Sequence, residues 1–336
     1  MRAEVVEASA PSIVADLPEG ETSDVPWYDK GRLHVGEAAI RTRPLELRYA
    51  NGTIVAGRSR MDGSEWFLVL QTAQGARMHR LVRSKGPTSV TVSADGATVV
   101  WVETLGEDLR RVTAYDVGSR RRLGSVRVPV HTFCCTGNGE VYVTSILRDG
   151  RVVWHTADRR PAVVWRPGDR GTVRLRGHRS RALTMGGWPG GVMWQARGRD
   201  IFYTPGVYAS VGRDGVAHRQ GRVPVEQRGG WSPDGRTFVY VGQEDGRSRH
   251  KEAAHALWAK NVATGQLLRL GLATDSSPNL IGWESPTEVL VWVSAGDDPD
   301  AGDSRVPQAL VRCEVSTGAC ERPAEPPSRL VNYPIW

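Results

Sequence analysis

The segment WSPDGRTFVYVG, residues 231–242, decides the fold, because a tight polar turn is followed by a strand of bulky side chains. Two altered copies occur elsewhere, VSADGATVVWVE at 92–103 and WESPTEVLVWVS at 283–294. Asp-Gly and Asn-Gly pairs suit a hairpin, since the turn needs a positive φ that glycine adopts without steric cost. The β-branched and aromatic residues that follow favour a strand. The repeated phrase therefore predicts a repeated β-hairpin.

This hairpin phrase recurs with a nearly constant period. Successive turns lie about 43 to 52 residues apart, the spacing of four-stranded propeller blades. A second hairpin with a short Ser- or Thr-Gly turn follows in several repeats, so that each repeat holds two hairpins in a fixed order. One segment, HKEAAHALWAK at 250–260, is expected to form a turn of helix. The copies of the first phrase are YANGTIVAGR (49–58), SADGATVVWV (93–102), TGNGEVYVTS (136–145), GWPGGVMWQA (187–196), SPDGRTFVYV (232–241) and ESPTEVLVWV (284–293).

We therefore predict an all-β fold, a single β-propeller of four-stranded antiparallel blades. Seven blades are favoured, and six are the alternative. The seventh blade would combine residues 27–42 with residues 328–336, so that strands from both termini close the ring and cover its sheet edges. The six blades predicted from the repeats span residues 46–84, 88–128, 130–168, 175–224, 226–271 and 278–322.

The N-terminal residues 1–24 are expected to be a flexible acidic lead-in, with the propeller domain at 25–336. They contain no apolar core of the kind found in secretory signal peptides, and no stretch of the chain approaches the roughly 20 apolar residues of a membrane span. These features favour the cytoplasm. A disulfide between Cys313 and Cys320 would instead favour an extracytoplasmic location. A monomer is expected.

Within the strongest copies, SPDG followed by an aromatic strand is typical of TolB-type, WD-repeat-like bacterial β-propellers, and the chain resembles this group. Ser232–Gly235 matches the motif fully, and Ser93–Gly96 matches it nearly. The resemblance implies the fold and, by association, a role in holding a partner protein. The extra N-terminal domain of periplasmic TolB proteins is not visible. The α/β-hydrolase domain of propeller-bearing peptidases has no room in the chain.

The predicted binding surface consists of the longer connections that leave one rim of the blades, at 166–181, 244–256 and 295–308. Binding residues tend to lie on variable loops held by a rigid scaffold. The first of these loops is strongly basic, and guanidinium groups pair bidentately with carboxylate or phosphate. An acidic ligand or an acidic protein patch is the ligand expected there, and a solvated loop is the alternative. The candidate binding residues are Arg170, Arg174, Arg176, His178, Arg179 and Arg181.

Other candidate sites are weaker, and no cofactor, metal or catalytic residue is predicted. The acidic loop near residue 300 lacks the spacing of a calcium loop, so its charges are read as solubilising. His250 and His255 do not form H-E-x-x-H, and no G-x-S-x-G elbow occurs. Asp234 is expected to cap its own turn rather than to form a sialidase-type Asp box. The acidic residues of that loop are Asp297, Asp298, Asp300 and Asp303.

Cysteine and tryptophan positions give two further expectations. Cys313 and Cys320 flank the last short turn symmetrically, which places them opposite each other on paired strands, close to disulfide geometry. The adjacent Cys134 and Cys135 are expected to be buried free thiols. The tryptophans at alternating strand positions are expected in the core: Trp101, Trp154, Trp194, Trp258 and Trp292.

The charge balance bears on the function. A net charge of +7 with a pI near 9.5 suggests nucleic acid, but only four of the 44 basic residues are lysines and acidic residues are spread throughout, which disfavours that partner. The favoured function is a non-catalytic binding or scaffold module that engages a protein or acidic ligand through its loop-rich face. The alternative is a propeller enzyme of glycosidase, lyase or lactonase type with its active site at the channel mouth.

Overall fold

The chain folds as a seven-bladed β-propeller in the computed structural model, which confirms the predicted fold class and blade number. Its contacts divide it into a larger unit (Pro26–Arg197, Gly206–Arg222 and Asn332–Trp336) and a smaller unit (Met1–Val25, Gly198–Pro205 and Val223–Val331). No α-helix occurs among the residues that the structure describes. These are residues 5–7, 16–29, 31–42, 46–60, 63–72, 75–86, 88–130, 140–156, 161–177, 188–195, 206–223, 229–242, 256–272, 276–295 and 308–324.

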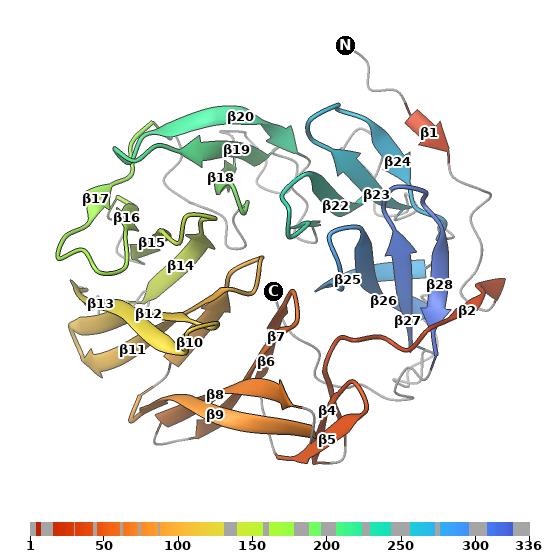
Figure 1. Ribbon diagram of the computed structural model, residues 1–336. Helices are drawn as coiled ribbons and strands as arrows, with labels where there is room; N and C mark the ends of the chain where they lie inside the picture. Colours follow the sequence, from red (N-terminus) through yellow and green to blue (C-terminus); the bar gives the residue numbers. More distant parts are fainter. Residues whose placement is uncertain are drawn as a thin grey trace, which may run out of the picture. The chain divides into compact units, whose positions relative to one another are not determined.

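The larger unit holds five antiparallel sheets, each built from strands that follow one another in the chain (Figure 1). Sequential hairpins explain this order, because each tight turn returns the chain beside the strand just completed. In spatial order the sheets are β3 (Trp27–Asp29), β4 (Arg32–Val35), β5 (Ala38–Arg41); β6 (Glu46–Ala50), β7 (Thr53–Arg60), β8 (Gly63–Thr72), β9 (Gly75–Ser84); β10 (Thr88–Val92), β11 (Thr98–Gly106), β12 (Leu109–Asp116), β13 (Arg121–Pro129); β14 (Val141–Ile146), β15 (Val152–Thr156), β16 (Val163–Trp165), β17 (Val173–Arg174); and β18 (Gly191–Gln195), β19 (Gly206–Val211), β20 (Ala217–Val223).

The smaller unit holds two sheets of five strands. In each sheet, four antiparallel strands come from the C-terminal part of the chain, and one short parallel strand comes from the N-terminal part. In spatial order the sheets are β1 (Val5–Glu7), β24 (Leu267–Arg269), β23 (Ala256–Asn261), β22 (Thr237–Gly242), β21 (Gly229–Trp231); and β2 (Glu19–Gly20), β28 (Cys320–Pro323), β27 (Gln308–Glu314), β26 (Glu288–Ala295), β25 (Ser276–Trp283).

The SPDG turn between β21 and β22 is held by its own side chains. The Ser232 hydroxyl donates to the Asp234 carboxylate at 2.6 Å, and that carboxylate accepts the Arg236 main-chain N–H at 3.0 Å. The Thr237 N–H donates to Ser232 Oγ at 2.9 Å, and Gly235 has φ +65°. Asp234 is thus the turn-capping residue that the sequence predicts, since short polar side chains satisfy the backbone of tight turns.

The same network recurs in the larger unit between β10 and β11. Ser93 Oγ donates to Asp95 Oδ1 at 2.5 Å, and it accepts the Thr98 N–H at 2.9 Å. Gly96 has φ +71°, and a Cβ there would lie 2.6 Å from the Ala50 carbonyl oxygen of the preceding sheet. Gly96 therefore serves both the turn and the close packing of two neighbouring blades.

The core lies between sheets and is filled by aliphatic and tryptophan side chains. Strand residues alternate between the two faces of a sheet, so a blade with neighbours on both faces needs apolar side chains at most positions of its central strands. Strand β11 shows this, because its first six residues, Thr98 to Glu103, are all buried. The five tryptophans predicted in the core are buried, which confirms that prediction: Trp101, Trp154, Trp194, Trp258 and Trp292.

The N-terminal segment of the smaller unit is joined to its last sheet by main-chain bonds. Strand β2 runs parallel to β28, where the Arg322 N–H donates to the Pro18 carbonyl at 2.8 Å and the Ala324 N–H donates to Gly20 at 3.1 Å. Leu17 is buried in the apolar cluster of this unit. The sequence assigns residues 1–24 to a flexible lead-in; the structure describes residues 5–7 and 16–24 of it, which include both β1 and β2.

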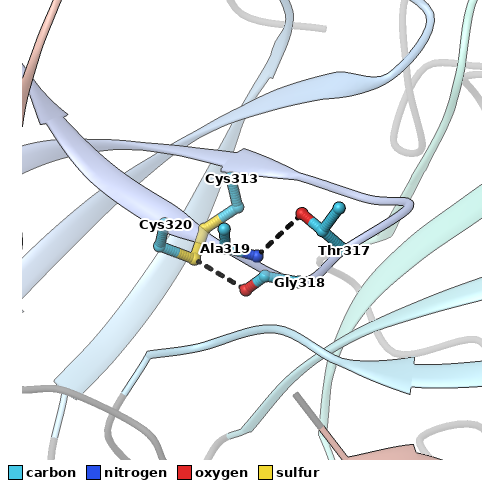
Figure 2. Close-up of a disulfide and its surroundings, with 5 residues drawn as sticks. All are labelled: Cys313, Thr317, Gly318, Ala319 and Cys320. Carbon is cyan, nitrogen blue, oxygen red and sulfur yellow. Dashed lines mark hydrogen bonds between the residues drawn. A yellow bond between two sulfur atoms is a disulfide. The ribbon is translucent and has the colours of Figure 1, made fainter. Parts of the chain in front are cut away.

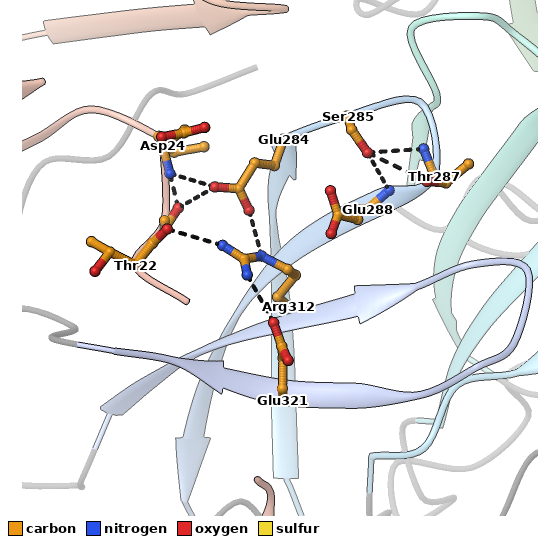
Figure 3. Close-up of polar contacts among 10 residues, drawn as sticks. Thr22, Asp24, Glu284, Ser285, Thr287, Glu288, Arg312 and Glu321 are labelled. Carbon is orange, nitrogen blue, oxygen red and sulfur yellow. Dashed lines mark hydrogen bonds and ion pairs between the residues drawn. The ribbon is translucent and has the colours of Figure 1, made fainter. Parts of the chain in front are cut away.

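A buried arginine fastens the same segment (Figure 3). Arg312 Nε donates to Glu284 at 2.6 Å, Nη1 donates to Glu321 at 2.7 Å, and Nη2 donates to the Thr22 carbonyl at 3.3 Å. The Arg312 and Glu284 side chains are 10% and 7% exposed. Burial disfavours the charge of Arg312, but its hydrogen bonds and attraction to Glu284 and Glu321 outweigh burial and raise its pKa. We call this group, with Ser23 and Asp24 on Glu284, the Arg312 clasp.

Several predicted boundaries differ from the structure. In the described part of the chain, residues 27–41 form the three-stranded sheet β3–β5, and the predicted contribution of residues 328–336 to this blade lies outside that part. The third repeat extends beyond its predicted end at 168, because β17 adds a strand at 173–174. The expected turn of helix at 250–260 is wrong from residue 256 onward, where β23 pairs with both β22 and β24.

Candidate functional site

The predicted arginine loop is divided by a strand. Arg170 lies in the connection between β16 and β17, Arg174 is the second residue of β17, and Arg176 follows that strand. All three side chains are exposed. The prediction that residues 166–181 form one connection is therefore wrong, because β17 pairs with β16 in the middle of it. His178, Arg179 and Arg181 lie outside the described residues.

The β16–β17 connection packs against the preceding blade. Trp165 Nε1 donates to the Asp169 carbonyl at 3.1 Å, which fixes the loop on its own sheet. A Cβ on Gly124 of β13 would lie 2.5 Å from the Gly168 main-chain nitrogen, so the two backbones touch and only glycine fits there. This contact brings the arginines of β13 beside those of the connection.

A second contact fixes the far end of β17 on the next sheet of the larger unit. Arg176 forms an isolated parallel bridge with Val216: its N–H donates to the Gly215 carbonyl at 2.9 Å, and its carbonyl accepts the Ala217 N–H at 2.8 Å. Its guanidinium reaches the Asp214 carbonyl at 3.3 Å. Arg176 therefore has a structural role in joining two blades, which sets it apart from Arg170 and Arg174.

These contacts assemble a basic surface from two consecutive blades. Residues 118–127 and 166–177 together contain eight arginines and one acidic residue, Asp169, so the surface carries a strong positive charge. Leu123 and Val173, which are 40% and 45% exposed, lie among the arginines and add apolar area. The seven of these arginines that lie outside the bridge are all exposed, and we define the basic surface by five of them, Arg121, Arg122, Arg166, Arg170 and Arg174.

The basic surface is suited to binding carboxylates or phosphates. Guanidinium groups offer paired donors that match these anions, and exposed leucine and valine allow contact with a protein surface beside them. Sequence reasoning missed Arg121 and Arg122, although the run SRRRLG at 119–124 is visible in the sequence. Their place beside Arg166 and Arg170 depends on the Gly124–Gly168 contact between blades, which no local pattern reveals.

The remaining predicted sites fall mostly outside the described part of the chain. This applies to the acidic loop (Asp297, Asp298, Asp300 and Asp303), to His250 and His255, and to Cys134 and Cys135. Most of the predicted loops at 244–256 and 295–308 lie there as well. Among the described residues, no three His, Cys, Asp or Glu side chains gather as a metal site would require.

Two deeply buried carboxylates are fully engaged by arginine. Glu103 accepts both Arg111 Nε and Nη2 at 2.9 Å, and its Oε2 also accepts Trp101 Nε1 at 3.1 Å. The hydrogen bond to Glu103 raises the pKa of Arg111. In the Arg312 clasp, Glu284 accepts Arg312 Nε on one oxygen, and its other oxygen accepts the Ser23 hydroxyl and the Asp24 N–H. Carboxylates paired like this stabilise their blades and are poor proton donors or acceptors for catalysis.

A further titratable pair lies on β14 and β15. The Tyr142 hydroxyl donates to the Glu140 carboxylate, and its ring stacks on His155 with centroids 5.3 Å apart. The hydrogen bond to Glu140 raises the pKa of Tyr142 to about 12, with burial and the charge of Glu140 adding to the effect. Burial lowers the pKa of His155, whose Nδ1 is buried and has no hydrogen-bond partner within the described residues.

The predicted disulfide is present (Figure 2). Cys313 and Cys320 are register partners in β27 and β28, and their sulfur atoms lie 2.05 Å apart. The intervening turn is closed by the Glu314 N–H, which donates to the Ala319 carbonyl at 2.9 Å. The symmetric spacing of the two cysteines about this turn was the signal that identified the pair.

No protein-family model matches the chain, and no curated protein matches it. Solved structures show the fold. The chain is similar to acylaminoacyl peptidase from Pyrococcus horikoshii, with 8% identity and a TM-score of 0.52 over 88% of this chain and 48% of that one. It is also similar to the β-propeller domain of the Trilobed protease from Pyrococcus furiosus, with 8% identity and a TM-score of 0.50 over 84% and 85%.

The matches also include TolB from Acinetobacter baumannii. Its identity is 11% and its TM-score 0.39, over 90% of this chain and 64% of TolB, so the chain spans less than two thirds of that protein. Likenesses this distant establish a β-propeller and leave the activity open. In the described residues there is no helix that could span a membrane.

Proposed function

We propose that the chain is a non-catalytic binding module. Its basic surface would hold a partner protein by binding an acidic patch on that partner. The basic surface carries this proposal, because two consecutive blades contribute five exposed arginines to it together with exposed Leu123 and Val173. A mixed basic and apolar surface on a rigid scaffold fits a protein better than a small anion, since apolar contact adds area that an anion cannot use.

The buried charges support binding rather than catalysis. Glu103 and Glu284 are both paired with arginine and are therefore unavailable as acid or base groups. The arginines of the basic surface come from two edge strands, β13 and β17, and from the connection before β17, rather than from several inner strands. Within the residues that the structure describes, no specific observation favours a glycosidase, lyase or lactonase.

We also infer that the chain works in an oxidising compartment. Disulfides persist in such compartments and are rare in a reducing cytoplasm. The Cys313–Cys320 bond thus favours the extracytoplasmic alternative over the cytoplasmic location expected from the N-terminal residues. Mass spectrometry of the protein isolated from its host under alkylating conditions tests this, and a fully alkylated Cys313–Cys320 pair would contradict it.

The binding test uses short poly-L-glutamate as a probe for an acidic patch. The variant Arg121→Glu/Arg122→Glu/Arg170→Glu/Arg174→Glu should bind it at least about tenfold more weakly, the equivalent of about 1.4 kcal/mol. The matched control reverses four exposed arginines elsewhere in the larger unit, Arg32, Arg41, Arg80 and Arg148, and changes the net charge equally.

Two outcomes would overturn the proposal. Equal losses in both variants would mean that the probe senses only net charge. A DNA duplex that binds the wild type more tightly than polyglutamate, with a steep dependence on salt, would indicate a nucleic-acid partner instead. Circular dichroism of both variants shows that they keep the fold.

A further inference from the structure

The Cys313–Cys320 disulfide lies beside the residues that hold the N-terminal segment. Arg312 and Cys313 are consecutive in β27, and their register partners in β28 are Glu321 and Cys320. Neighbouring residues of a strand point to opposite faces of the sheet, so the disulfide lies on one face and the Arg312–Glu321 ion pair lies on the other. The disulfide and the Arg312 clasp therefore occupy successive pairs of one ladder (Figure 2, Figure 3).

Strand β28 connects the N-terminal segment to the rest of its sheet. It pairs with β27 on one side and with β2 on the other. On the β2 side the Arg322 N–H donates to the Pro18 carbonyl at 2.8 Å, and the Ala324 N–H donates to the Gly20 carbonyl at 3.1 Å. Arg322 Nε also donates to the Leu17 carbonyl at 3.3 Å. These donors reach the segment only while β28 keeps its place beside β27.

Two further sets of contacts depend on the same pair of strands. Leu17 of the segment is buried in the apolar cluster that contains both cysteines. Arg312 binds the Thr22 carbonyl, and it also binds Glu284, which accepts the Asp24 N–H. The segment at residues 16–24 is thus attached through β28, through the apolar cluster and through the Arg312 clasp. All three attachments require β27 and β28 to stay aligned.

The disulfide is the cross-link that keeps these two strands aligned. Strand β28 has four residues, and two register pairs join it to β27. Short elements with few bonds open locally at a small cost in free energy, and a disulfide restricts such opening by removing open conformations. Reduction of the bond restores those conformations. Each opening of β28 then breaks its bonds to Pro18 and Gly20 and separates Glu321 from Arg312.

We propose that the Cys313–Cys320 disulfide is a redox switch for the N-terminal segment, which stays attached while the bond is oxidised and detaches when a dithiol reduces it. Detachment leaves the sheets of the larger unit in place, because those sheets are built from other parts of the chain. The switch involves neither the basic surface nor its partner, so this inference goes beyond the proposed function and does not rest on it.

The chemical step is thiol–disulfide exchange. Cys320 is 8% exposed and Cys313 is 0% exposed, so we expect the thiolate of the dithiol to attack the Cys320 sulfur. The S–S bond breaks, Cys313 leaves as a thiolate, and the second thiol of the reagent then displaces Cys320. Two electrons pass from the dithiol to the protein, and the two thiol protons of the reagent end on the cysteine sulfurs. The reagent itself becomes a cyclic disulfide.

The test compares the full chain before and after treatment with dithiothreitol under native conditions. Amide hydrogen exchange is measured at Asp24, Arg322 and Ala324, whose N–H groups bond between the segment and the last sheet. A protease that cuts after glutamate provides a second readout, because the exposed residues Glu19 and Glu21 become cleavable once the segment leaves the sheet. Exchange in β23, in the other sheet of the smaller unit, is the internal control.

We expect reduction to accelerate both exchange at Arg322 and Ala324 and cleavage after Glu19 by at least about tenfold, with exchange in β23 changed much less. The variant Cys313→Ala/Cys320→Ala should behave like the reduced wild type. Dithiothreitol should have no further effect on this variant, which shows that the reagent acts through this bond and not through other cysteines.

Three results would overturn the proposal. Faster exchange at Glu314 and Gly318, whose N–H groups bond within the turn, without a change at Arg322 and Ala324 would mean that the disulfide supports only its own hairpin. Equal acceleration in β23 would mean that reduction loosens the whole unit rather than the segment. An effect of dithiothreitol that persists in Cys313→Ala/Cys320→Ala would assign the change to a different site.

Discussion

Replacing Arg312 with methionine should release the N-terminal segment from the last sheet of the smaller unit. Methionine keeps an unbranched apolar stem of similar length, so the change removes the guanidinium with little loss of packing. The variant leaves the Glu284 carboxylate buried without its cation and the Thr22 carbonyl without a donor. Any loss of stability in this variant therefore comes from the lost bonds of the Arg312 clasp rather than from a cavity in the core.

The size of the effect follows from the burial of each partner. Removing one member of a buried pair costs about 3–5 kcal/mol, because a charge is left uncompensated in a poorly solvated place. Glu284 retains the Ser23 hydroxyl and the Asp24 N–H as donors, which favours the lower end of this range. Glu321 is 35% exposed, so its ion pair adds about 1 kcal/mol or less. We expect a loss of about 3 kcal/mol in unfolding free energy.

Urea denaturation measures this loss, and amide hydrogen exchange shows where it acts. Exchange at Asp24, Arg322 and Ala324 should accelerate, because each of these amides donates a hydrogen bond between the N-terminal segment and the last sheet. The matched control is Arg236→Met, which breaks a 3.8 Å ion pair with Asp234 from a side chain that is 80% exposed. Exposed pairs contribute about 0.2–1 kcal/mol, so the control should cost little.

Equal losses in the two variants would refute the reasoning, since burial would then have no influence on the strength of the pair. A loss of 3 kcal/mol without faster exchange at Arg322 and Ala324 would be equally damaging. It would show that Arg312 stabilises its own hairpin and has no effect on the attachment of the N-terminal segment. A Glu284→Gln/Arg312→Met double-mutant cycle separates the direct coupling from the cost of the orphaned carboxylate.

Three further outcomes are expected. Cys313→Ser/Cys320→Ser should lower the unfolding free energy by about 2.5 kcal/mol, which is the loop entropy expected for a disulfide with a sequence separation of 7. In urea denaturation the wild type in reductant should be as unstable as this variant, and unchanged stability would contradict the prediction. Gly96→Ala should lower the stability more than Gly52→Ala. Both glycines have positive φ, which strains alanine by about 1–2 kcal/mol, but of these two only Gly96 would place a Cβ 2.6 Å from a carbonyl oxygen. Equal decreases in the melting temperatures of the two variants would disprove the inter-blade contact. Burial lowers the pKa of His155 below its usual 6.5, so the unfolded chain binds more protons than the folded one, and the unfolding free energy should fall as pH decreases through 6.5 toward the folded pKa. Urea titrations at several pH values should show that the unfolding free energy of His155→Gln changes less steeply with pH than that of the wild type, and an identical slope would rule this out.

The features that sequence reasoning predicted correctly are those with local causes. The Ser-Asp-Gly turns need nothing beyond their own side chains, and Cys313 and Cys320 face each other because a short turn lies midway between them. Strand β17 could not be predicted, since two residues are too few to show a period. The sequence of residues 256–260 is compatible with either a helix or a strand. The structure has a strand there because β22 and β24 pair with it on both sides.

The candidate site was predicted only in part for a related reason. Arg170 and Arg174 stand out in a basic segment, but the partners that make a surface of them, Arg121 and Arg122, come from the preceding blade. The Gly124–Gly168 contact joins the two groups, and contacts between blades depend on how whole sheets pack. The short strands β1 and β2 are equally invisible, because they form on edges supplied by distant parts of the chain.

The attachment of the N-terminal segment also sets an order of events during synthesis. Arg312 and the Thr22 carbonyl that it binds are 290 residues apart, so the segment around Thr22 cannot be attached until synthesis has passed Arg312. The five sheets of the larger unit are each made from neighbouring residues and can form while translation continues. The segment around Thr22 and the sheet that contains Arg312 therefore join late, because a very long loop must be closed first.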